Sequence, residues 1–98
     1  MTSKSVAVHV THRVNLNRFE IREDKHIAFL RYKREGARVI MDHTYVPDEL
    51  RGRGLANALV NAALEEARPQ GWTIVPKCSF VAGIIERNSK FADLVERL

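Results

Sequence analysis

The stretch of sequence that decides the fold is Pro47-Asp48-Glu49-Leu50-Arg51-Gly52-Arg53-Gly54-Leu55-Ala56. Residues 39–46, directly before it, are rich in β-branched and aromatic side chains, which favour a strand that ends at Pro47. From Leu55 to Ala67, apolar residues recur at three- and four-residue spacing, as on one face of a helix. The quoted stretch is therefore predicted to be the loop between a strand and a helix.

Further elements are predicted on both sides of this loop. Upstream, the alternating runs 18–22 and 27–32 flank the turn residues Glu23-Asp24-Lys25 and predict a β-hairpin, and a second turn is expected over 33–36. Downstream, Pro69 and Gly71 are expected to end the helix. The segments that follow are expected to form a strand (72–75), a short helix (80–85) and a helical turn (91–95).

Together these elements predict one α+β domain over residues 1–98, of which residues 1–8 are expected to fray. The strand–helix–strand unit should place strand 72–75 beside strand 39–46 and parallel to it. The remaining strands should pair antiparallel, with the helices packed against the sheet as a second layer.

Length and composition exclude several classes of protein. A chain of 98 residues with 45% hydrophobic and 29% charged residues has one small core, which excludes a disordered chain and a large two-lobed enzyme. Cys78 is the single cysteine and cannot form an internal disulfide, and neither a secretory signal nor an apolar run of roughly 20 residues occurs. We therefore expect a cytoplasmic protein without a membrane partner.

The formal charge of +4 permits a nucleic acid, a membrane surface or a phosphate-bearing small molecule as partner. The position of the excess positive charge along the chain narrows this choice of partner, because the whole excess lies before Gly54. Residues 1–53 hold 11 basic and 7 acidic side chains, while residues 54–98 hold 5 of each. Arg51 and Arg53 lie together at the break between strand and helix.

Gly52 and Gly54 have two explanations at the first turn of a helix. They can relax a tight strand-to-helix corner, or they can let an anion approach the unpaired amides and positive dipole end of the helix. The segment lacks the P-loop pattern, and Asn57 stands where a dinucleotide fingerprint needs its third glycine. Both familiar nucleotide-binding loops are therefore excluded.

Arg51-x-x-Gly54-x-Ala56 matches the Arg/Gln-x-x-Gly-x-Gly/Ala signature that binds the pyrophosphate of acetyl-CoA. On this motif and its surroundings, the chain resembles the GCN5-related N-acetyltransferases, and among them the short stand-alone N-acetyltransferase domain-containing subfamily. The resemblance extends from about Arg18 to Val95. The surrounding segments that carry it are Arg18-Phe19-Glu20-Ile21, His43-Thr44 before Val46-Pro47, Gly71-Trp72, and Pro76-x-Cys78-x-Phe80-Val81.

The resemblance implies a minimal acyl-CoA N-acyltransferase fold and acetyl-CoA as cosubstrate. Strands 39–46 and 72–75 would separate, so that the pantetheine arm could pair with the free strand backbone. The residues that it implies at the cofactor are Thr44, Tyr45 and Val46 at the acyl end, and Arg51, Gly52, Arg53, Gly54, Leu55 and Ala56 at the pyrophosphate.

Two catalytic residues are candidates. Cys78 follows the strand at 72–75 and could accept the acetyl group as a thiolate or only contact the cofactor, whereas a free cysteine is often simply buried. His43 could act as general base, directly or through water, or serve only for packing. We expect no metal site, because His9, His12 and His26 lack zinc-ligand spacing.

The leading hypothesis is an N-acetyltransferase acting on an unknown amine or thiol acceptor, small or on a partner protein. A non-catalytic acyl-CoA-binding module is the alternative, because Tyr45 occupies a position that is often glutamate in the family, and Asn88-Ser89-Lys90-Phe91 replaces a stretch like His-Pro-Glu-Tyr. A small basic nucleic-acid binder is a third class. We do not expect it, because Arg51-Gly52-Arg53 lacks the flanking prolines of a minor-groove hook.

Overall fold

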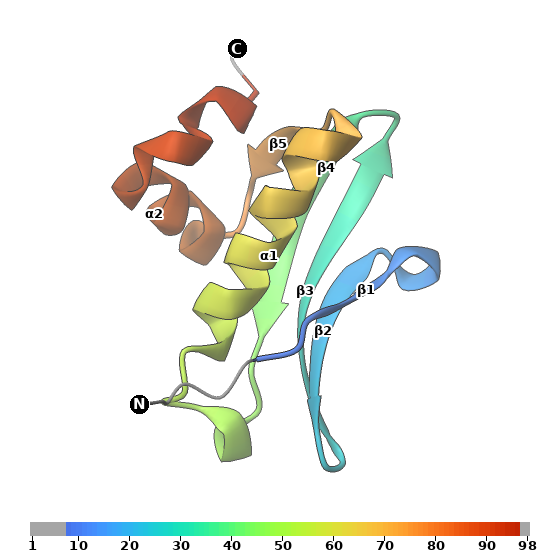
Figure 1. The fold of residues 1–98 in the computed structure, drawn as a ribbon, viewed down its shortest axis with the longest axis vertical. Helices are drawn as coiled ribbons and strands as arrows, with labels where there is room; N and C mark the ends of the chain where they lie inside the picture. The colour runs from blue at the N-terminus through green and yellow to red at the C-terminus, as the bar shows by residue number, and fades with distance from the viewer. Residues whose placement is uncertain (1–7, 97–98) are drawn as a thin grey trace.

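Five strands form one sheet, and helices α1 and α2 lie side by side on one of its faces (Figure 1). The computed structural model describes residues 8–96, so the N-terminal residues expected to fray lie, except for Val8, outside the described residues. The sheet order is β1-β2-β3-β4-β5. Its strands are β1 (Thr11–Arg13), β2 (Arg18–Glu23), β3 (His26–Glu35), β4 (Arg38–Tyr45) and β5 (Thr73–Pro76).

The predicted fold class is confirmed. Strands β1 to β4 pair antiparallel, and β4 pairs parallel with β5, from Arg38 opposite Thr73 to Met41 opposite Pro76. The helical segments are α1 (Leu55–Gln70), α2 (Ser79–Arg87) and the 3-10 turns η1 (Val14–Leu16), η2 (Asp48–Leu50) and η3 (Ser89–Leu94). Every strand and helix predicted from the sequence is present, while β1 was not predicted.

Two boundaries differ from the prediction. Residues 33–35, expected in a turn, belong to β3, because Glu35 pairs with Arg38 across a tighter turn at Gly36 and Ala37. Helix α1 continues through Pro69 to Gln70. Pro69 has no amide hydrogen, so it removes one helical hydrogen bond, but the helix ends only one residue later. Gly71 caps this end with a left-handed φ of 70°: its amide donates to the Arg68 carbonyl, and the Trp72 amide donates to the Ala67 carbonyl.

A β-bulge lies in β4 at Asp42. Arg31 pairs with His43 but Tyr32 pairs with Met41, so Asp42 is an extra residue on the β4 side. A bulge reverses which face the following side chains occupy. Met41 is buried beneath α1, and after the bulge Thr44, opposite the buried Leu30, takes that face, while His43 lies on the other face.

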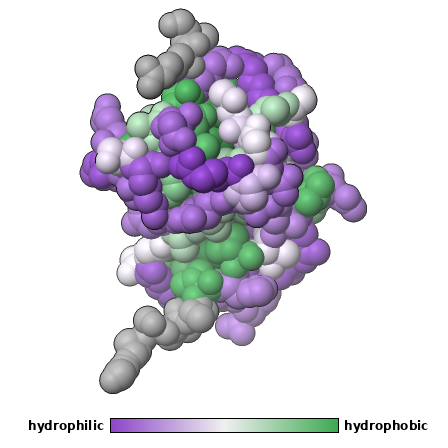
Figure 2. Space-filling model, turned by 45° about the horizontal axis from the view of Figure 1, so that its top comes forward, coloured by the Kyte–Doolittle hydropathy of each residue, from purple (hydrophilic) through white to green (hydrophobic). Residues whose placement is uncertain are grey.

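The core lies between the sheet and α1. Its sheet side includes Phe19, Leu30 and Met41, and its helix side includes Leu59 and Leu64, all nearly inaccessible to solvent. On the face of the molecule shown in Figure 2, hydrophilic side chains cover most of the surface and hydrophobic ones emerge in separate places. Within residues 8–96, no helix is both long and apolar enough to cross a membrane.

Candidate functional site

The parallel strands β4 and β5 separate at one end. Their pairing ends with Met41 and Pro76, while β4 continues to Tyr45. At the point of separation, the Cys78 amide donates a hydrogen bond to the Met41 carbonyl at 3.0 Å. Within the described residues 8–96, no strand is paired with β4 on this side beyond Met41. The backbone of residues 42–46 is therefore available on that edge to an extended ligand.

The loop before α1 presents amide groups at a helix N-terminus. Leu50 is buried and anchors the loop in the core, while Gly52 and Gly54 have φ of 83° and 71°, a left-handed conformation that favours glycine. The first hydrogen bond of the helix joins the Ala58 amide to the Gly54 carbonyl. The amides from Gly54 to Asn57 precede that bond and have no intrahelical acceptor, so they can bind an anion.

A hollow of about 340 Å³ opens at this helix N-terminus. It joins the end of β4 to the first turns of α1 and α2. Its lining consists of Val46, Leu50, Arg51, Gly52, Gly54, Leu55, Ala56, Asn57 and Phe80. Six of the predicted cofactor residues therefore share one hollow.

Three predicted cofactor residues lie outside this lining, and three lining residues were not predicted. Arg53 lines a neighbouring hollow with Val8, Glu23 and Leu55, while Thr44 and Tyr45 lie further back along β4. Leu50, Asn57 and Phe80 were missed as site residues. Phe80 gave a usable signal, because it is a large apolar residue at the start of the helix predicted over 80–85, shortly after the end of β5; in the structure it is 36% exposed.

Both loop arginines contact the protein. The Arg51 side chain donates to the Val46 carbonyl at 3.3 Å and pairs with Asp48 at 3.2 Å. Arg53 forms an ion pair with Glu23 at the end of β2. Such exposed pairs contribute little to stability, so either guanidinium can turn towards an anion at modest cost.

Cys78 and Thr44 meet where the strands separate. Their side chains approach to 3.6 Å between Oγ1 and Sγ, from the N-terminus of α2 and from β4. Burial raises the pKa of the Cys78 thiol, but the Val81 and Phe80 amides at the start of α2 and the Thr44 hydroxyl outweigh it, so the pKa is lowered overall. The thiolate, which is the nucleophilic form, is thereby favoured.

His43 and Tyr45 lie on the opposite face of the sheet from this thiol. His43 is exposed and pairs across the strands with Arg31, and Tyr45 pairs with Phe29. Both rings contact Phe29, with centroids 5.9 Å and 5.6 Å from it. The structure thus brings Thr44 to Cys78 and separates both from His43 and Tyr45.

Comparison with known proteins agrees with this architecture. The family model described as GCN5-related N-acetyl-transferase matches residues 18–94. The chain belongs to the GCN5-related N-acetyltransferase family. The NMR structure of a GCN5-like protein from Staphylococcus aureus superposes with a TM-score of 0.71 at 29% identity, covering 93% of this chain and 90% of that one.

Membership of the GCN5-related family connects the separated strands and the glycine loop to one kind of ligand. Members of this family generally use acetyl-CoA as cosubstrate and pass its acetyl group to an acceptor. Among the described residues, no three His, Cys, Asp or Glu side chains gather in a way that could hold a metal ion.

Proposed function

We propose that this protein binds acetyl-CoA and transfers its acetyl group to an amine or thiol acceptor, as a member of the short stand-alone subfamily. The observation that carries the proposal is the hollow at the N-terminus of α1, which joins a glycine loop with unpaired amides to the free edge of β4. The end of the hollow at the glycine loop suits a diphosphate, and the end at β4 suits an extended pantetheine arm.

The pyrophosphate would bind to the amides of residues 52–57. Gly52 and Gly54 leave the approach to the backbone open, since nothing lies within 4 Å of a Cβ built on either. The positive end of the α1 dipole and the guanidinium groups of Arg51 and Arg53 would balance the phosphate charge.

The pantetheine arm would pair with β4 beyond Met41, as an added strand does at a free sheet edge. Val46 lies at the end of this edge and lines the hollow, while Thr44 lies further along, next to Cys78. An arm that starts at Gly54 and follows β4 towards Met41 would bring its thioester to the Thr44–Cys78 pair.

Two routes for the acetyl group fit this arrangement. In the direct route, the acceptor nitrogen attacks the thioester carbonyl carbon, the C–S bond to CoA breaks, CoA leaves as a thiolate and the nitrogen loses a proton. In the covalent route, the Cys78 thiolate attacks first and releases CoA, and the acceptor then breaks the new C–S bond. A backbone amide facing the carbonyl oxygen would stabilise either tetrahedral intermediate by about 3 kcal/mol.

His43 would serve as general base only for an acceptor that arrives over the sheet face opposite α1, because its ring lies on that face. Tyr45 ends the same face and would contact such an acceptor. The non-catalytic module remains the alternative function, and it predicts the same cofactor binding without transfer.

Binding and turnover are tested separately. Acetyl-CoA at about 100 times its dissociation constant should stabilise the fold by roughly 2.7 kcal/mol and raise the melting temperature by roughly 10–20 °C. Release of free CoA is then followed with a panel of amines and thiols. Stabilisation without CoA release would support the module, and the absence of any stabilisation would contradict both functions.

The route is tested by mass spectrometry after incubation with acetyl-CoA alone. One added acetyl group on Cys78 supports the covalent route. A Cys78→Ala protein with unchanged turnover would eliminate it and leave the direct route.

A further inference from the structure

The sheet face opposite α1 and α2 carries a row of cations. Alternate side chains of β1, β2 and β3 point to this face, and no helix within residues 8–96 covers it (Figure 1). We name it the basic face and define it by five cations and the two carboxylates that they contact: Arg13, Arg18, Arg22, Arg31, Lys33, Glu20 and Asp42.

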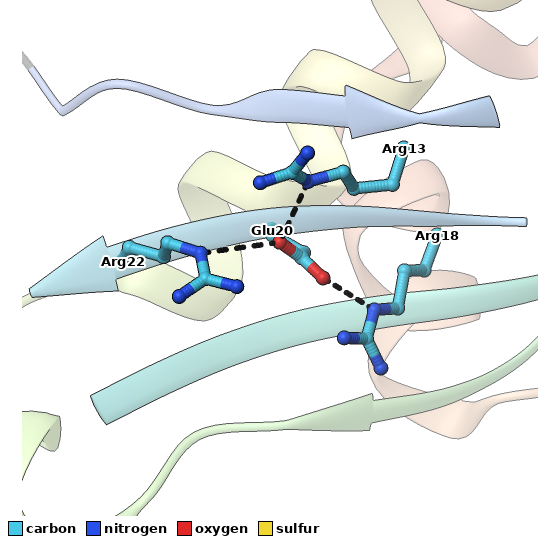
Figure 3. Close-up of polar contacts among 4 residues, drawn as sticks. All are labelled: Arg13, Arg18, Glu20 and Arg22. Carbon is cyan, nitrogen blue, oxygen red and sulfur yellow. Dashed lines mark hydrogen bonds and ion pairs between the residues drawn. The ribbon is translucent and has the colours of Figure 1, made fainter. Parts of the chain in front are cut away.

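At the centre of the basic face, three arginines surround one carboxylate (Figure 3). Arg18 lies 2.5 Å from Glu20, Arg13 lies 3.1 Å away and Arg22 3.7 Å away. The Glu20 side chain is only 1% exposed although no helix within residues 8–96 covers this face, because the three arginines and its cross-strand neighbours Thr11 and Phe29 surround it. One negative charge against three positive ones leaves a surplus of two cations.

The same imbalance continues along β3 as far as Lys33, beyond which Arg38 pairs with both Glu35 and Glu96. Asp42, the bulge residue, contacts Arg31 at 3.3 Å and Lys33 at 3.9 Å, which leaves a further unmatched cation. Arg22 and Lys33 are the most exposed cations of the face, at 57% and 72%, and lie furthest from their carboxylates. They are therefore the cations most available to a partner.

Apolar side chains lie next to these cations. Ile27, Phe29, Ile40 and Val75 are half-buried at alternating positions on the same face of the sheet. The aromatic rings do not form a flat platform: Tyr45 is tilted by 40° against Phe29, and the Arg18 guanidinium lies 5.1 Å over the Phe29 ring. Successive nucleic-acid bases need open parallel ring faces, so this surface suits a chain with carboxylates and aliphatic side chains better.

We propose that the basic face docks an acidic segment of a partner protein in which carboxylates alternate with aliphatic residues. The surplus of three positive charges supplies the complementarity, and Ile27, Ile40 and Val75 supply apolar contact. Arginine can bind a carboxylate through paired N–H donors, as Arg31 already does at Asp42.

Docking at the basic face does not depend on the proposed acetyl transfer, but the position of the basic face is compatible with that reaction. His43 and Tyr45 lie on the same side of the sheet, where β4 runs beyond β5. A docked segment would therefore end near the strand edge at which we propose the acetyl group lies.

The test uses a fluorescein-labelled peptide of alternating glutamate and valine, and fluorescence anisotropy with the full chain at several salt concentrations. We expect saturable binding that weakens as salt increases. The double substitution Arg22→Gln and Lys33→Gln should weaken it about tenfold, while the matched pair Arg87→Gln and Lys90→Gln, with the same change of charge on the helix side, should leave it unchanged.

Three results would overturn the proposal: no binding of the acidic peptide, equal weakening by both double substitutions, or tighter charge-dependent binding of a single-stranded oligothymidylate than of the peptide. The last result would assign the basic face to nucleic acid. Circular dichroism of both double variants checks that the fold is kept, and binding is measured without acetyl-CoA, so the failure of the proposed function does not affect it.

Discussion

Cys78 occupies an environment that differs from that of a purely structural cysteine. A thiol buried among apolar groups has a raised pKa, whereas the start of α2 and the Thr44 hydroxyl lower the pKa of Cys78 despite its partial burial. The sequence predicted the cysteine but not its contact with Thr44, because the two residues lie 34 positions apart.

Substitution of Thr44 by valine should raise the pKa of Cys78, because it removes the hydroxyl that favours the thiolate. The rate of alkylation by iodoacetamide, followed against pH, should reach its midpoint at a higher pH in the variant. Thr73→Val, a threonine of β5 away from the thiol, is the matched control. An unchanged midpoint in Thr44→Val would contradict the proposed role of the hydroxyl.

Glu20→Gln should destabilise the fold at neutral pH by about 2 kcal/mol, because it removes the charge that three arginines share. Burial raises the pKa of Glu20, but Arg18 and Arg13 lower it overall. The advantage of the wild type is therefore present above the ordinary pKa of glutamate and is lost as the pH falls through the lowered folded-state value.

Urea unfolding of both proteins across that pH range measures this difference. Glu86→Gln on the exposed surface of α2 should change stability by less than about 0.5 kcal/mol at any pH. A constant difference between wild type and Glu20→Gln from neutral to acid pH would contradict the account.

His43 illustrates what a sequence pattern cannot decide about a single residue. Alternation from Val39 and Met41 would place residue 43 on the core face, but the bulge at Asp42 moves it to the opposite face and brings Thr44 inwards. Nothing in a single sequence marks that extra residue, so the face of the proposed base follows only from the structure.

The loop before α1 affects both the stability of the fold and the proposed binding of acetyl-CoA. Gly54→Ala should cost about 1 kcal/mol, because Gly54 has a φ of 71° that a Cβ disfavours. It should also weaken acetyl-CoA binding by more than that strain explains, since the new methyl group would lie beside the amides that we propose bind phosphate.

Gly36→Ala is the matched control for this prediction. Gly36 has a φ of 62° in the β3–β4 turn and is likewise free of neighbours within 4 Å. Both variants should lose similar stability in thermal unfolding, and only Gly54→Ala should lose the stabilisation by acetyl-CoA. Equal stabilisation of the two variants by acetyl-CoA would contradict binding of the cofactor at the glycine loop.

Most elements could be predicted because their local signals agree with the fold. The period-two hairpin, the alanine-rich α1 and the Gly71 cap each have a pattern that tertiary contacts reinforce. Strand β1 could not be predicted, because three residues are too few to show an alternating pattern and the strand forms by pairing with β2. Lys33 to Glu35 carry charges typical of a turn but face water along an extended strand.

At the scale of the whole molecule, the sheet separates two surfaces. The edge of β4 and the N-termini of α1 and α2 surround the hollow at which we propose acetyl-CoA binds, and the basic face lies across the sheet from both helices. Sequence motifs predicted the first surface, because the glycine loop is local. The second depends on side chains from three strands and the bulge, which only the folded sheet brings together.

The most direct test of the account is a titration of the isotopically labelled protein with acetyl-CoA, followed by the amide resonances in NMR. We expect the largest shifts at two places, the loop amides of residues 52–57 and the β4 edge at residues 42–46, with smaller changes at Cys78 and Phe80. Shifts absent from both the loop and the β4 edge, or confined to the basic face, would contradict it.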